Sequence, residues 1–445
     1  MTSDDLRGLV EANKEMAKHY KANLDLYLGD HPFLTETRDG FGPDNRLVAN
    51  LAKYIVETFN GYFMGIPPKI TLDDDTDNDK LQHWNDTNSF QDKLNEISKQ
   101  SDIYGRSIAF LYTDENSETA ITYCAPDQAF IVYDDSVAHK PLAFVRYLFD
   151  ENDAISGVVH YSDVKIEFDN NYALGEKEDN KLEAVPAVEF YTNEERQGVF
   201  DGATTLIDAL DRTLSQKANQ NQYFDNSYLK ILGIDLDSDG DGKPDIDLEN
   251  DHMLYSPDPE AVNAIVEFIA KPDNDSMQEH MIDRLVALIY QTTMVPNLND
   301  EAFSGNSSGV ALQFKLLPMK NMAASKERKF TRSLRQLYKI AFGVGTILEE
   351  SKADSWQDLS FQFTRNMPVN LADEATTAST LEGIVSKETQ LGTLSIVDDP
   401  KAEMKRLADE ESDQVQRAVT NVASATDQQK GSESDGTKED DNNDK

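Results

Sequence analysis

The sequence predicts an α+β fold, and three observations indicate it. Apolar residues recur at the helical spacing of three and four in the first part of the chain and again after Thr204. Between Ile103 and about Tyr191, short apolar runs alternate with turn residues, as antiparallel strands do. The chain has 445 residues, of which 39% are hydrophobic, so about two or three domains with much polar surface are possible. A mostly antiparallel sheet packed with helices is the expected class.

The stretch NRLVANLAKYIVETFNGYFMGIPPKI predicts the first of the N-terminal helices. Its apolar positions recur on one face: Leu47, Leu51, Tyr54, Ile55 and Phe59. Proline cannot continue a helix, so the sequence GIPP at 65–68 ends it. The polar link DDDTDNDK follows, and a second helix is expected from about Leu81 to Ser101.

The next segment predicts strands. SIAFLYTDENSETAITYCAPDQAFIVYDDS has a strand, a hairpin turn at DENS, a second strand, a break at Pro126 and a third strand. PLAFVRYLF, ISGVVHYS and VKIEF continue the pattern. Cys124 falls on a predicted strand with no histidine nearby in sequence, which favours a buried structural thiol.

A long helix is expected from Thr204, with an apolar stripe too narrow for a compact core. Such a helix suits packing between neighbours in an assembly. A further helix in SMQEHMIDRLVALIYQTTMVPNL ends at Pro296, and a polar loop follows from Asn299 to Gly309. A long helix comes next and contains Pro318, which predicts a kink near Phe314 and Lys315. The last region predicts a strand and two or three helices, then an acidic, disordered tail beyond residue 423.

The formal charge of −40 opposes ordinary binding to phosphate backbones, which requires Lys and Arg. It is compatible with simple solubility and with a surface that meets nucleic acid without holding it. The charge is reversed locally between Lys315 and Lys339, where eight bases face one acid, Glu327. This basic face is either the solvated side of a helix or a place that meets phosphate or an acidic neighbouring subunit. Its members include Lys315, Lys320, Lys326, Arg328, Lys329, Arg332 and Arg335.

The stretch DLDSDGDGKPDIDLEND resembles a calcium loop. Asp237, Asp239, Asp241 and Asp245 occupy positions one, three, five and nine of an EF-hand count. Position twelve is Leu248 instead of the bidentate glutamate, so the full EF-hand pattern fails and a shorter calcium loop fits better. Two interpretations stay open: an exposed acidic loop without metal, and a structural calcium site. No cofactor is required in either case.

Several functional classes are excluded or disfavoured. No run of eighteen apolar residues exists for a membrane span, the N-terminus does not have the pattern of a secretory signal, and the single cysteine indicates a reducing compartment. The sequence contains no P-loop, no His-Glu-x-x-His and no Gly-x-Ser-x-Gly, and its seven histidines are scattered. An enzyme, including a metal-dependent hydrolase built on the aspartates, is therefore not expected. A calcium-binding structural or adhesion module is the alternative, and the lack of repeats weighs against it.

The order of these features resembles the portal proteins of tailed bacteriophages, in the SPP-one-type branch. YIVETFNGYFMGIPPKI is similar to the N-terminal helix of that family, and SDIYGRSIAFLYTDENSETAITYCAPDQAFIVYDDS to its first wing strands. LIDALDRTLSQKANQNQYFDNSYLKILG resembles the helix that enters the stem. VPNLNDEAFSGNSSGVALQFKL is similar to the channel loop and following helix, and SKETQLGTLSIVDDPKAEMKRLADEE to the crown. The resemblance extends over roughly residues 40 to 415.

The resemblance implies a portal fold with an α/β wing, a helical stem, a small clip and a helical crown. The implied segments are a wing at 1–203, stem helices at 204–230 and 276–298, a clip at 231–275, a channel loop at 299–309, a kinked helix returning to the wing at 310–365, a crown at 366–423 and a disordered tail at 424–445. The implied channel-loop residues are Asn299, Phe303, Asn306, Ser307 and Ser308.

The same resemblance implies the function and the partners. About twelve subunits would form a ring at one capsid vertex, made in the host cytoplasm and retained in the virion, through which double-stranded DNA passes. The ring would nucleate head assembly, dock the large subunit of terminase and receive head completion or adaptor proteins. The major capsid and scaffolding proteins are further implied partners, and no membrane is involved.

Overall fold

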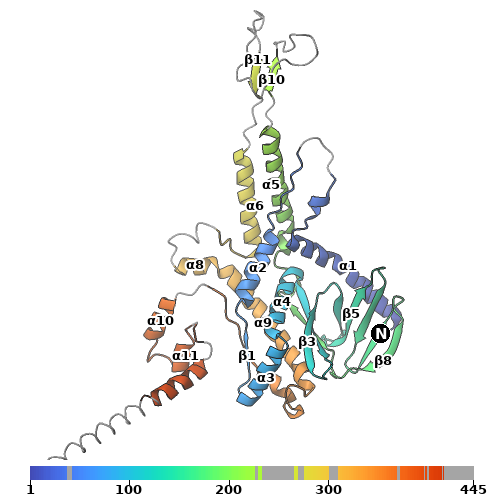
Figure 1. Ribbon diagram of the computed structural model, residues 1–445, viewed down its shortest axis with the longest axis vertical. Helices are drawn as coiled ribbons and strands as arrows, with labels where there is room; N and C mark the ends of the chain where they lie inside the picture. The colour runs from blue at the N-terminus through green and yellow to red at the C-terminus, as the bar shows by residue number, and fades with distance from the viewer. Residues whose placement is uncertain are drawn as a thin grey trace, which may run out of the picture. The chain divides into compact units, whose positions relative to one another are not determined.

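A computed structural model of the chain describes residues 1–37, 43–225, 229–232, 265–268, 275–299, 309–367, 371–394, 396–397, 400–412 and 414 (Figure 1). The chain divides into two compact units, Met1–Asn366 and Met367–Lys445, and each is described by itself. Helices and antiparallel strands are both abundant in the first unit, so the α+β class is confirmed. No helix in the described part of the chain combines the length and the apolar character that crossing a membrane requires.

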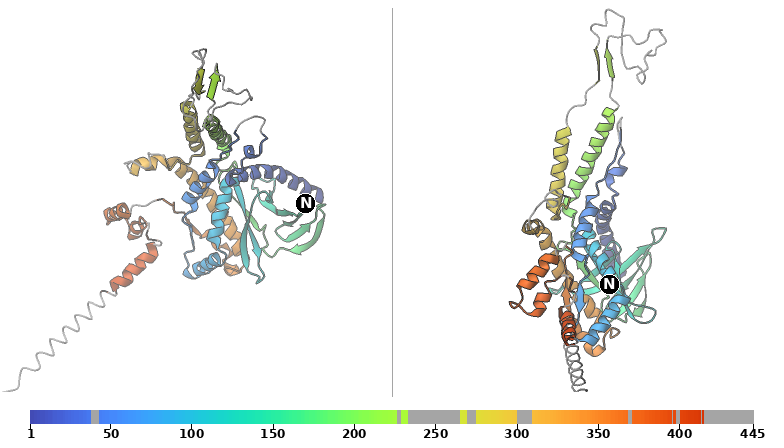
Figure 2. Two further views of the ribbon diagram at one scale, coloured as in Figure 1. Left: turned by 45° about the horizontal axis from the view of Figure 1, so that its top comes forward. Right: turned by 60° about the vertical axis from the view of Figure 1, so that its left-hand side comes forward.

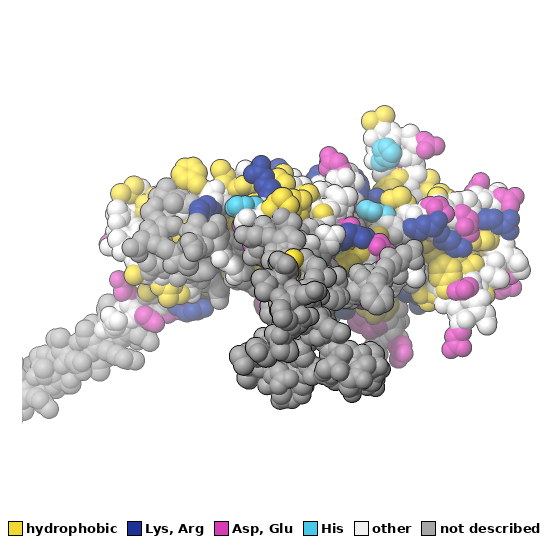
Figure 3. Space-filling model, turned by 90° about the horizontal axis from the view of Figure 1, so that it is seen from above, with side chains coloured by type: hydrophobic (Ala, Val, Ile, Leu, Met, Phe, Trp, Pro, Cys, Tyr) yellow, Lys and Arg dark blue, Asp and Glu magenta, His cyan; other side chains and the backbone are white. Residues whose placement is uncertain are grey.

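The chain begins with a long surface helix, α1 (Ser3–Leu28). A capping box starts it, because Thr2 Oγ1 accepts from the Asp5 backbone N–H while Asp5 accepts from the Thr2 N–H. Gly29, at φ 89°, ends it in the left-handed conformation that glycine adopts without strain. The exposed face of α1 carries ion pairs between residues three or four positions apart, such as Lys18 with Glu15 at 2.7 Å. Figure 3 shows the resulting mixture of basic and acidic side chains over this end of the unit, on the right of the view.

The next helix, α2 (Leu51–Met64), follows the short 3₁₀ helix η1 (Pro32–Thr35) and starts later than the apolar pattern predicts. Asn50 has φ 39° and caps the helix by accepting from the Lys53 N–H, so the helix cannot extend back to Leu47. Leu47 is 46% exposed, and its N–H donates to Ser215 Oγ at 2.9 Å. The helix ends at Gly65 before the two prolines, as predicted.

The helix predicted from Leu81 to Ser101 is two helices, α3 (Asp75–Thr87) and α4 (Phe90–Tyr104). The single-helix prediction is wrong because Ser89, at φ 49°, is left-handed and breaks the α-helical path. The break lets the buried rings of Trp84 and Phe90 pack 5.8 Å apart across the bend. An apolar spacing alone does not reveal such a turn.

The predicted strand region forms two antiparallel sheets. The strands of the first, in the order β3-β2-β9, are β2 (Arg106–Thr113), β3 (Thr119–Cys124) and β9 (Ala187–Tyr191). The strands of the second, in sequence order, are β4 (Ala129–Tyr133), β5 (Pro141–Phe149), β6 (Ile155–His160), β7 (Val164–Phe168) and β8 (Leu174–Asp179). The hairpin turn at DENS is confirmed, since the Asp114 N–H donates to the Glu118 carbonyl at 2.9 Å.

The five-stranded sheet is packed on both faces (Figures 1 and 2). Alternate residues of β5 point to opposite sides, so Val145 and Tyr147 pack with Leu6 and Val10 of α1. On the other side, Phe144 packs with residues of β2 in a second apolar cluster.

Two titratable side chains border this second cluster. Cys124 is half-buried, less enclosed than its strand position predicts, and burial raises the pKa of its thiol. The ring of His160 packs against Phe110 and Phe144, and burial lowers its pKa to about 4. This histidine is therefore neutral at pH 7 and part of the packing.

The long helix α9 (Leu317–Gly343) crosses the first unit and packs on α4 and β9. After α9 come the 3₁₀ helix η4 (Glu350–Gln357) and β12 (Ser360–Gln362), which pairs with β1 (Lys69–Thr71). The core beside α9 is aromatic, because Phe330 of α9 packs edge-on against Phe63 of α2 at 5.4 Å and against Phe190 of β9 at 5.2 Å.

A buried ion pair joins α9 to α4. Lys326 Nζ lies 2.7 and 2.8 Å from the two carboxylate oxygens of Asp102, and both side chains are fully buried. Nζ also donates to Ser98 Oγ at 2.8 Å, and Thr192 Oγ1 donates to Asp102 Oδ1 at 3.1 Å. Burial lowers the pKa of Lys326 and raises the pKa of Asp102, so the geometry of the pair must offset both effects.

The remaining elements of the first unit are a pair of helices and short pieces around it. They are η2 (Asp201–Ala203), α5 (Thr204–Asp225), α6 (Asp275–Thr293) and α8 (Gly309–Lys315), with the hairpin β10 (Leu229–Leu232) and β11 (Ile265–Phe268) between α5 and α6. The second unit contains α10 (Leu371–Thr380), α11 (Lys387–Leu391) and helical residues 400–412. In it, Gln390 is buried and donates to the Ala378 carbonyl at 2.7 Å. The predicted disordered tail lies outside the described residues.

The ion pair predicts an asymmetric response to substitution. Lys326→Met leaves a buried, unpaired carboxylate, and we expect it to lower the free energy of unfolding by about 3–5 kcal/mol. Adding Asp102→Leu should restore most of this loss, because two apolar side chains need no partner. Urea unfolding at one protein concentration measures both. Arg328→Met, at an exposed position on the same helix, is the matched control; a single variant at Lys326 as stable as this control would contradict the prediction.

Candidate functional site

The pair α5 and α6 projects from the first unit and is the candidate functional element (Figure 1). The helices run antiparallel, since Gly202 at the start of α5 lies beside Thr292 at the end of α6. Buried Leu285 and Ile289 hold α6 at its base, where Tyr290 also packs edge-on against Tyr54 of α2 at 6.0 Å.

Farther out, the contacts between the two helices are polar. Gln278 Nε2 donates to Gln220 Oε1 at 2.9 Å, and Lys217 forms an ion pair with Glu279. Among the described side chains, the contacts between the two helices thus change from apolar near the base to polar farther out.

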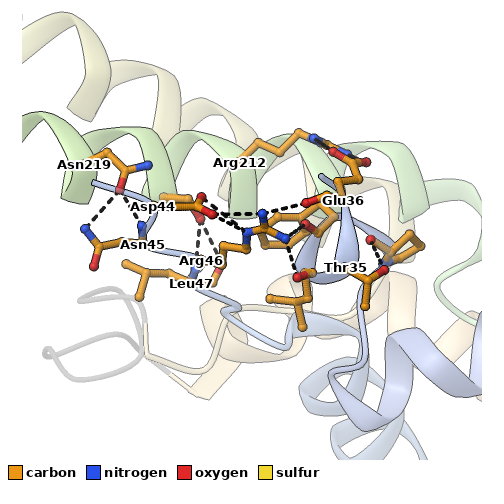
Figure 4. A network of polar contacts seen from close by, with 12 residues as sticks. Thr35, Glu36, Asp44, Asn45, Arg46, Leu47, Arg212 and Asn219 are labelled. Carbon is orange, nitrogen blue, oxygen red and sulfur yellow. Dashed lines mark hydrogen bonds and ion pairs between the residues drawn. The ribbon is translucent and has the colours of Figure 1, made fainter. Parts of the chain in front are cut away.

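A chain segment between α1 and α2 lies along α5 and is held by a network of polar contacts (Figure 4). The Arg46 guanidinium donates to the carbonyl oxygens of Phe33 at 3.0 Å and Glu36 at 2.6 Å, and to that of Leu34. It therefore closes the segment on itself, because one planar group with five N–H donors serves three carbonyls.

Two contacts join the closed segment to α5. The guanidinium of Arg212 pairs with both carboxylate oxygens of Glu36, at 2.6 and 2.9 Å, which lowers the pKa of Glu36. About two turns further along α5, Asn45 donates to Asn219 Oδ1. The ion pair between Arg212 and Glu36 is exposed, so it sets geometry more than stability, whereas the contact between Asn45 and Asn219 is half-buried.

The buried part of this joint is centred on Asp211. Its Oδ1 accepts from the Ala49 N–H at 2.8 Å, and its Oδ2 lies 2.7 Å from His31 Nδ1. The side chains of Asp211 and His31 are both fully buried. An acid inside the apolar stripe of α5 is thus the point at which the α1–α2 segment is fixed to this helix.

The helix that contains Pro318 is divided at Leu316 into α8 and α9. Pro318 lies in the first turn of α9, where a missing N–H leaves no intrahelical bond unmade. The Leu316 N–H donates to the Leu312 carbonyl at 3.1 Å and the Lys320 N–H to the Leu316 carbonyl at 2.9 Å, so helical bonding is present on both sides of the junction. A hollow of about 590 Å³ lies beside this junction, and its lining includes Tyr290 of α6, Met294 directly after α6, Lys315 and Pro318.

The predicted basic face contains one residue that is not on the surface. Lys326 is buried in the ion pair with Asp102, so its assignment to a solvated surface is wrong. It lies four residues before Phe330 on the buried side of α9, and its ammonium contacts the rings of Phe59, Phe63 and Phe330. The other members are exposed or half-buried: Lys315, Lys320, Arg328, Lys329, Arg332 and Arg335. Lys329 pairs with Glu194 at 2.5 Å, and Arg335 donates to the carbonyls of Gln357 and Leu359. Structural contacts thus engage part of this set.

The remaining predicted site residues fall largely outside the described residues. Phe303, Asn306, Ser307 and Ser308 of the channel loop do so, as do Asp237, Asp239, Asp241 and Asp245 of the acidic loop. Asn299 is described: its N–H donates to Asn297 Oδ1 at 3.1 Å. Within the described ranges, no group of three or more His, Cys, Asp or Glu side chains could hold a metal ion.

Sequence reasoning missed Asp211, His31 and Arg46. An acid within an apolar stripe is a weak pointer to Asp211, but its partners come from residues some 160 or more positions away in the chain. Arg46 has one local acceptor, the carboxylate of Asp44, but no local pattern points to the three backbone carbonyls that it also serves.

The described part of the first unit thus combines two sheets packed with helices, an anchored projecting helix pair and a divided long helix. Comparison with known families shows the class of protein to which this arrangement belongs. The family described as "Phage portal protein, SPP1 Gp6-like" matches residues 8–417. The portal protein of Bacillus phage SPP1 is 23% identical over 397 residues, which cover 82% of this chain and 76% of that protein.

The chain belongs to the SPP1 Gp6-like family of phage portal proteins. It is therefore a non-enzymatic component of the phage virion with a role in genome packaging. Membership implies that copies of the chain work as an oligomeric ring through which DNA passes.

The buried joint predicts unequal effects for two acids of α5. Asp211→Ala leaves the Ala49 N–H and His31 without their partner, and we expect a loss of about 2–5 kcal/mol in the free energy of unfolding. Asp208→Ala removes only a half-exposed contact with Arg212, at 2.8 Å, and should cost about 0–1 kcal/mol. Urea unfolding of both variants checks this, and equal losses would show that Asp211 does not anchor α5.

Proposed function

We propose that about twelve copies of the chain form a ring at one vertex of the capsid, with the α5–α6 pair as the stem. The family match over residues 8–417 carries the proposal. The geometry of α5 and α6 supports it, because two helices with polar outer contacts and a single apolar side need further packing partners. Neighbouring copies in a ring supply such partners.

In this proposal, segments 1–203 and 310–365 form the wing, 231–275 the clip, 299–309 the channel loop and 366–423 the crown. The division of the chain after Asn366 supports a separate crown. The break at Leu316 supports a helix that turns from the channel wall toward the wing, since α9 continues into the core at Phe330.

The charge of the chain supports a conduit that does not grip its cargo. Each phosphate that a Lys or Arg neutralises adds binding energy and releases counterions, which would resist sliding. Twelve copies of a chain with a net charge of −40 repel a polyanion along the axis. Short uncharged side chains, such as Asn306, Ser307 and Ser308 of the proposed channel loop, would touch DNA without such a cost.

The proposed ring has several partners. The clip would dock the large subunit of terminase during packaging and then the head completion or adaptor protein. The wing and crown would meet the major capsid and scaffolding proteins, so that the ring nucleates head assembly. After packaging, the same channel would release the genome.

Negative-stain electron microscopy of the purified chain tests the ring. We expect annular particles with a central hole, and class averages that give the number of subunits. Particles without a hole at every protein concentration would contradict the proposed function. Among rings, Phe303→Ala should leave the annulus intact and alter only the packaging of DNA.

We further propose that the loop from Asp237 to Asp245 binds one structural calcium ion, as its spacing of oxygen ligands suggests. Isothermal titration with calcium should give heat of binding for the native chain and none for Asp239→Ala. Asp247→Ala, outside the ligand positions, is the control. No heat in the native chain would favour the metal-free acidic loop, and ring formation would be unaffected in either case.

A further inference from the structure

A hollow of about 460 Å³ lies in the first unit between the β4–β5 hairpin, β9 and α9. Its apolar lining comes from Ile131, Pro141, Ala187 and Val188. Aromatic walls are added by Tyr133 and Tyr191. Burial raises the pKa of Tyr133 well above its ordinary value, so the hydroxyl is a neutral donor.

The charged side chains that line the hollow are two acids, Glu189 and Glu194, and two bases, Arg196 and Arg332. Arg196 stacks its guanidinium 4.3 Å from the centre of the Tyr191 ring and pairs with Glu189 at 3.1 Å. Glu189 is also 3.3 Å from Arg106, and Glu194 pairs with Lys329.

Arg106 and Lys329 pair with the two acids from outside the lining, so the charged set around the hollow contains four bases and two acids. This local excess of positive charge occurs in a chain whose net charge is −40. The positive charge around this hollow favours the binding of an anion, whereas the net negative charge of the chain opposes it.

Three side chains that line the hollow have hydrogen-bond donors available for a ligand: Arg332, Tyr133 and Gln336. Arg332 is exposed, and within the described residues its side chain forms no hydrogen bond or ion pair. The same holds in that part of the chain for the hydroxyl of Tyr133 and the amide of Gln336. The pKa of Glu194 is lowered mainly by its contact with Lys329, and the charges of Arg196 and Arg332 add to this effect, so Arg332 lies near the charged side chains of the hollow. A guanidinium, a hydroxyl and an amide around one apolar floor match carboxylates beside an apolar side chain.

We propose that this hollow binds an acidic segment of a partner protein. Carboxylates of the segment would be taken by Arg332, with Tyr133 and Gln336 as further donors, and an aromatic or aliphatic side chain would lie against Ile131 and Val188. The function is separate from the passage of DNA and does not depend on the proposed number of subunits.

Two other ligands fit less well. A DNA backbone needs a row of basic residues, whereas this hollow offers one unpaired guanidinium above an apolar floor. The acidic end of this chain, residues 423–445, contains no aromatic residue and no aliphatic residue larger than alanine, so it cannot fill the floor. An acidic segment with an apolar residue is the chemistry that uses the whole hollow.

A labelled peptide tests the proposal with the full chain. The probe is a fluorescein-labelled peptide with Phe at the centre of four glutamates, measured by fluorescence anisotropy. We expect saturable binding that Arg332→Glu and Arg332→Gln weaken by about tenfold or more. Arg328→Glu carries the same charge change on the same helix outside the hollow and should leave the affinity unchanged. Replacing the Phe of the peptide by Ser should also weaken binding.

Four results of the binding experiment would overturn the proposal. They are no saturable binding by the native chain, equal weakening by the variants at Arg332 and Arg328, displacement of the peptide by a short DNA duplex at equal phosphate and carboxylate concentrations, and tighter binding after removal of residues 424–445. Thermal unfolding of each variant shows whether it is folded, since Arg332 is exposed and has no structural contact to lose. Loss of rings in Arg332→Gln under the microscope would instead assign the hollow to the contact between copies, and also overturn it.

Discussion

The ion pair between Lys326 and Asp102 is the constraint on which the arrangement of the first unit depends. Both groups are fully buried, and three phenylalanine rings surround the ammonium. If α9 slid by one residue against α4, it would leave two unpaired charges in an apolar core, which costs several kcal/mol. The pair therefore fixes the register of α9, and with it the α8–α9 junction at Leu316. An apolar contact at this position would tolerate sliding, because dispersion and the hydrophobic effect are not directional.

The projecting helix pair is held in a related way. Buried Asp211 fixes α5 to the segment after α1, and the half-buried contacts of Arg46 and the exposed ones of Arg212 shape that segment around it. Polar groups inside an apolar surface specify one geometry, because each donor must find its own acceptor. Such fixed geometry suits a subunit of a ring, where a small error in each copy would prevent closure.

Much of the fold could be predicted from the sequence, and the errors have specific causes. The strands between Arg106 and Tyr191 and the ends of α2 at Gly65 and α6 before Pro296 follow from alternation and from glycine and proline. The break at Ser89 and the late start of α2 were not predictable, because both depend on a left-handed residue that is not glycine. Lys326 was assigned to the surface because charge normally marks a solvated face, and only a partner 224 residues away reverses this.

The class of fold, the positions of most helices and strands, the acidic character and the likeness to portal proteins can all be predicted from the amino-acid sequence. These depend on local periodicity, composition and the order of motifs, all of which are readable along one chain. Four contacts are visible only in the folded structure: the pairing of β9 with β2, the ion pairs of Lys326 with Asp102 and of His31 with Asp211, and the place of Arg332 beside the hollow. Each is a contact between distant segments, and a buried polar group can choose its partner only once the backbone has brought the candidates together.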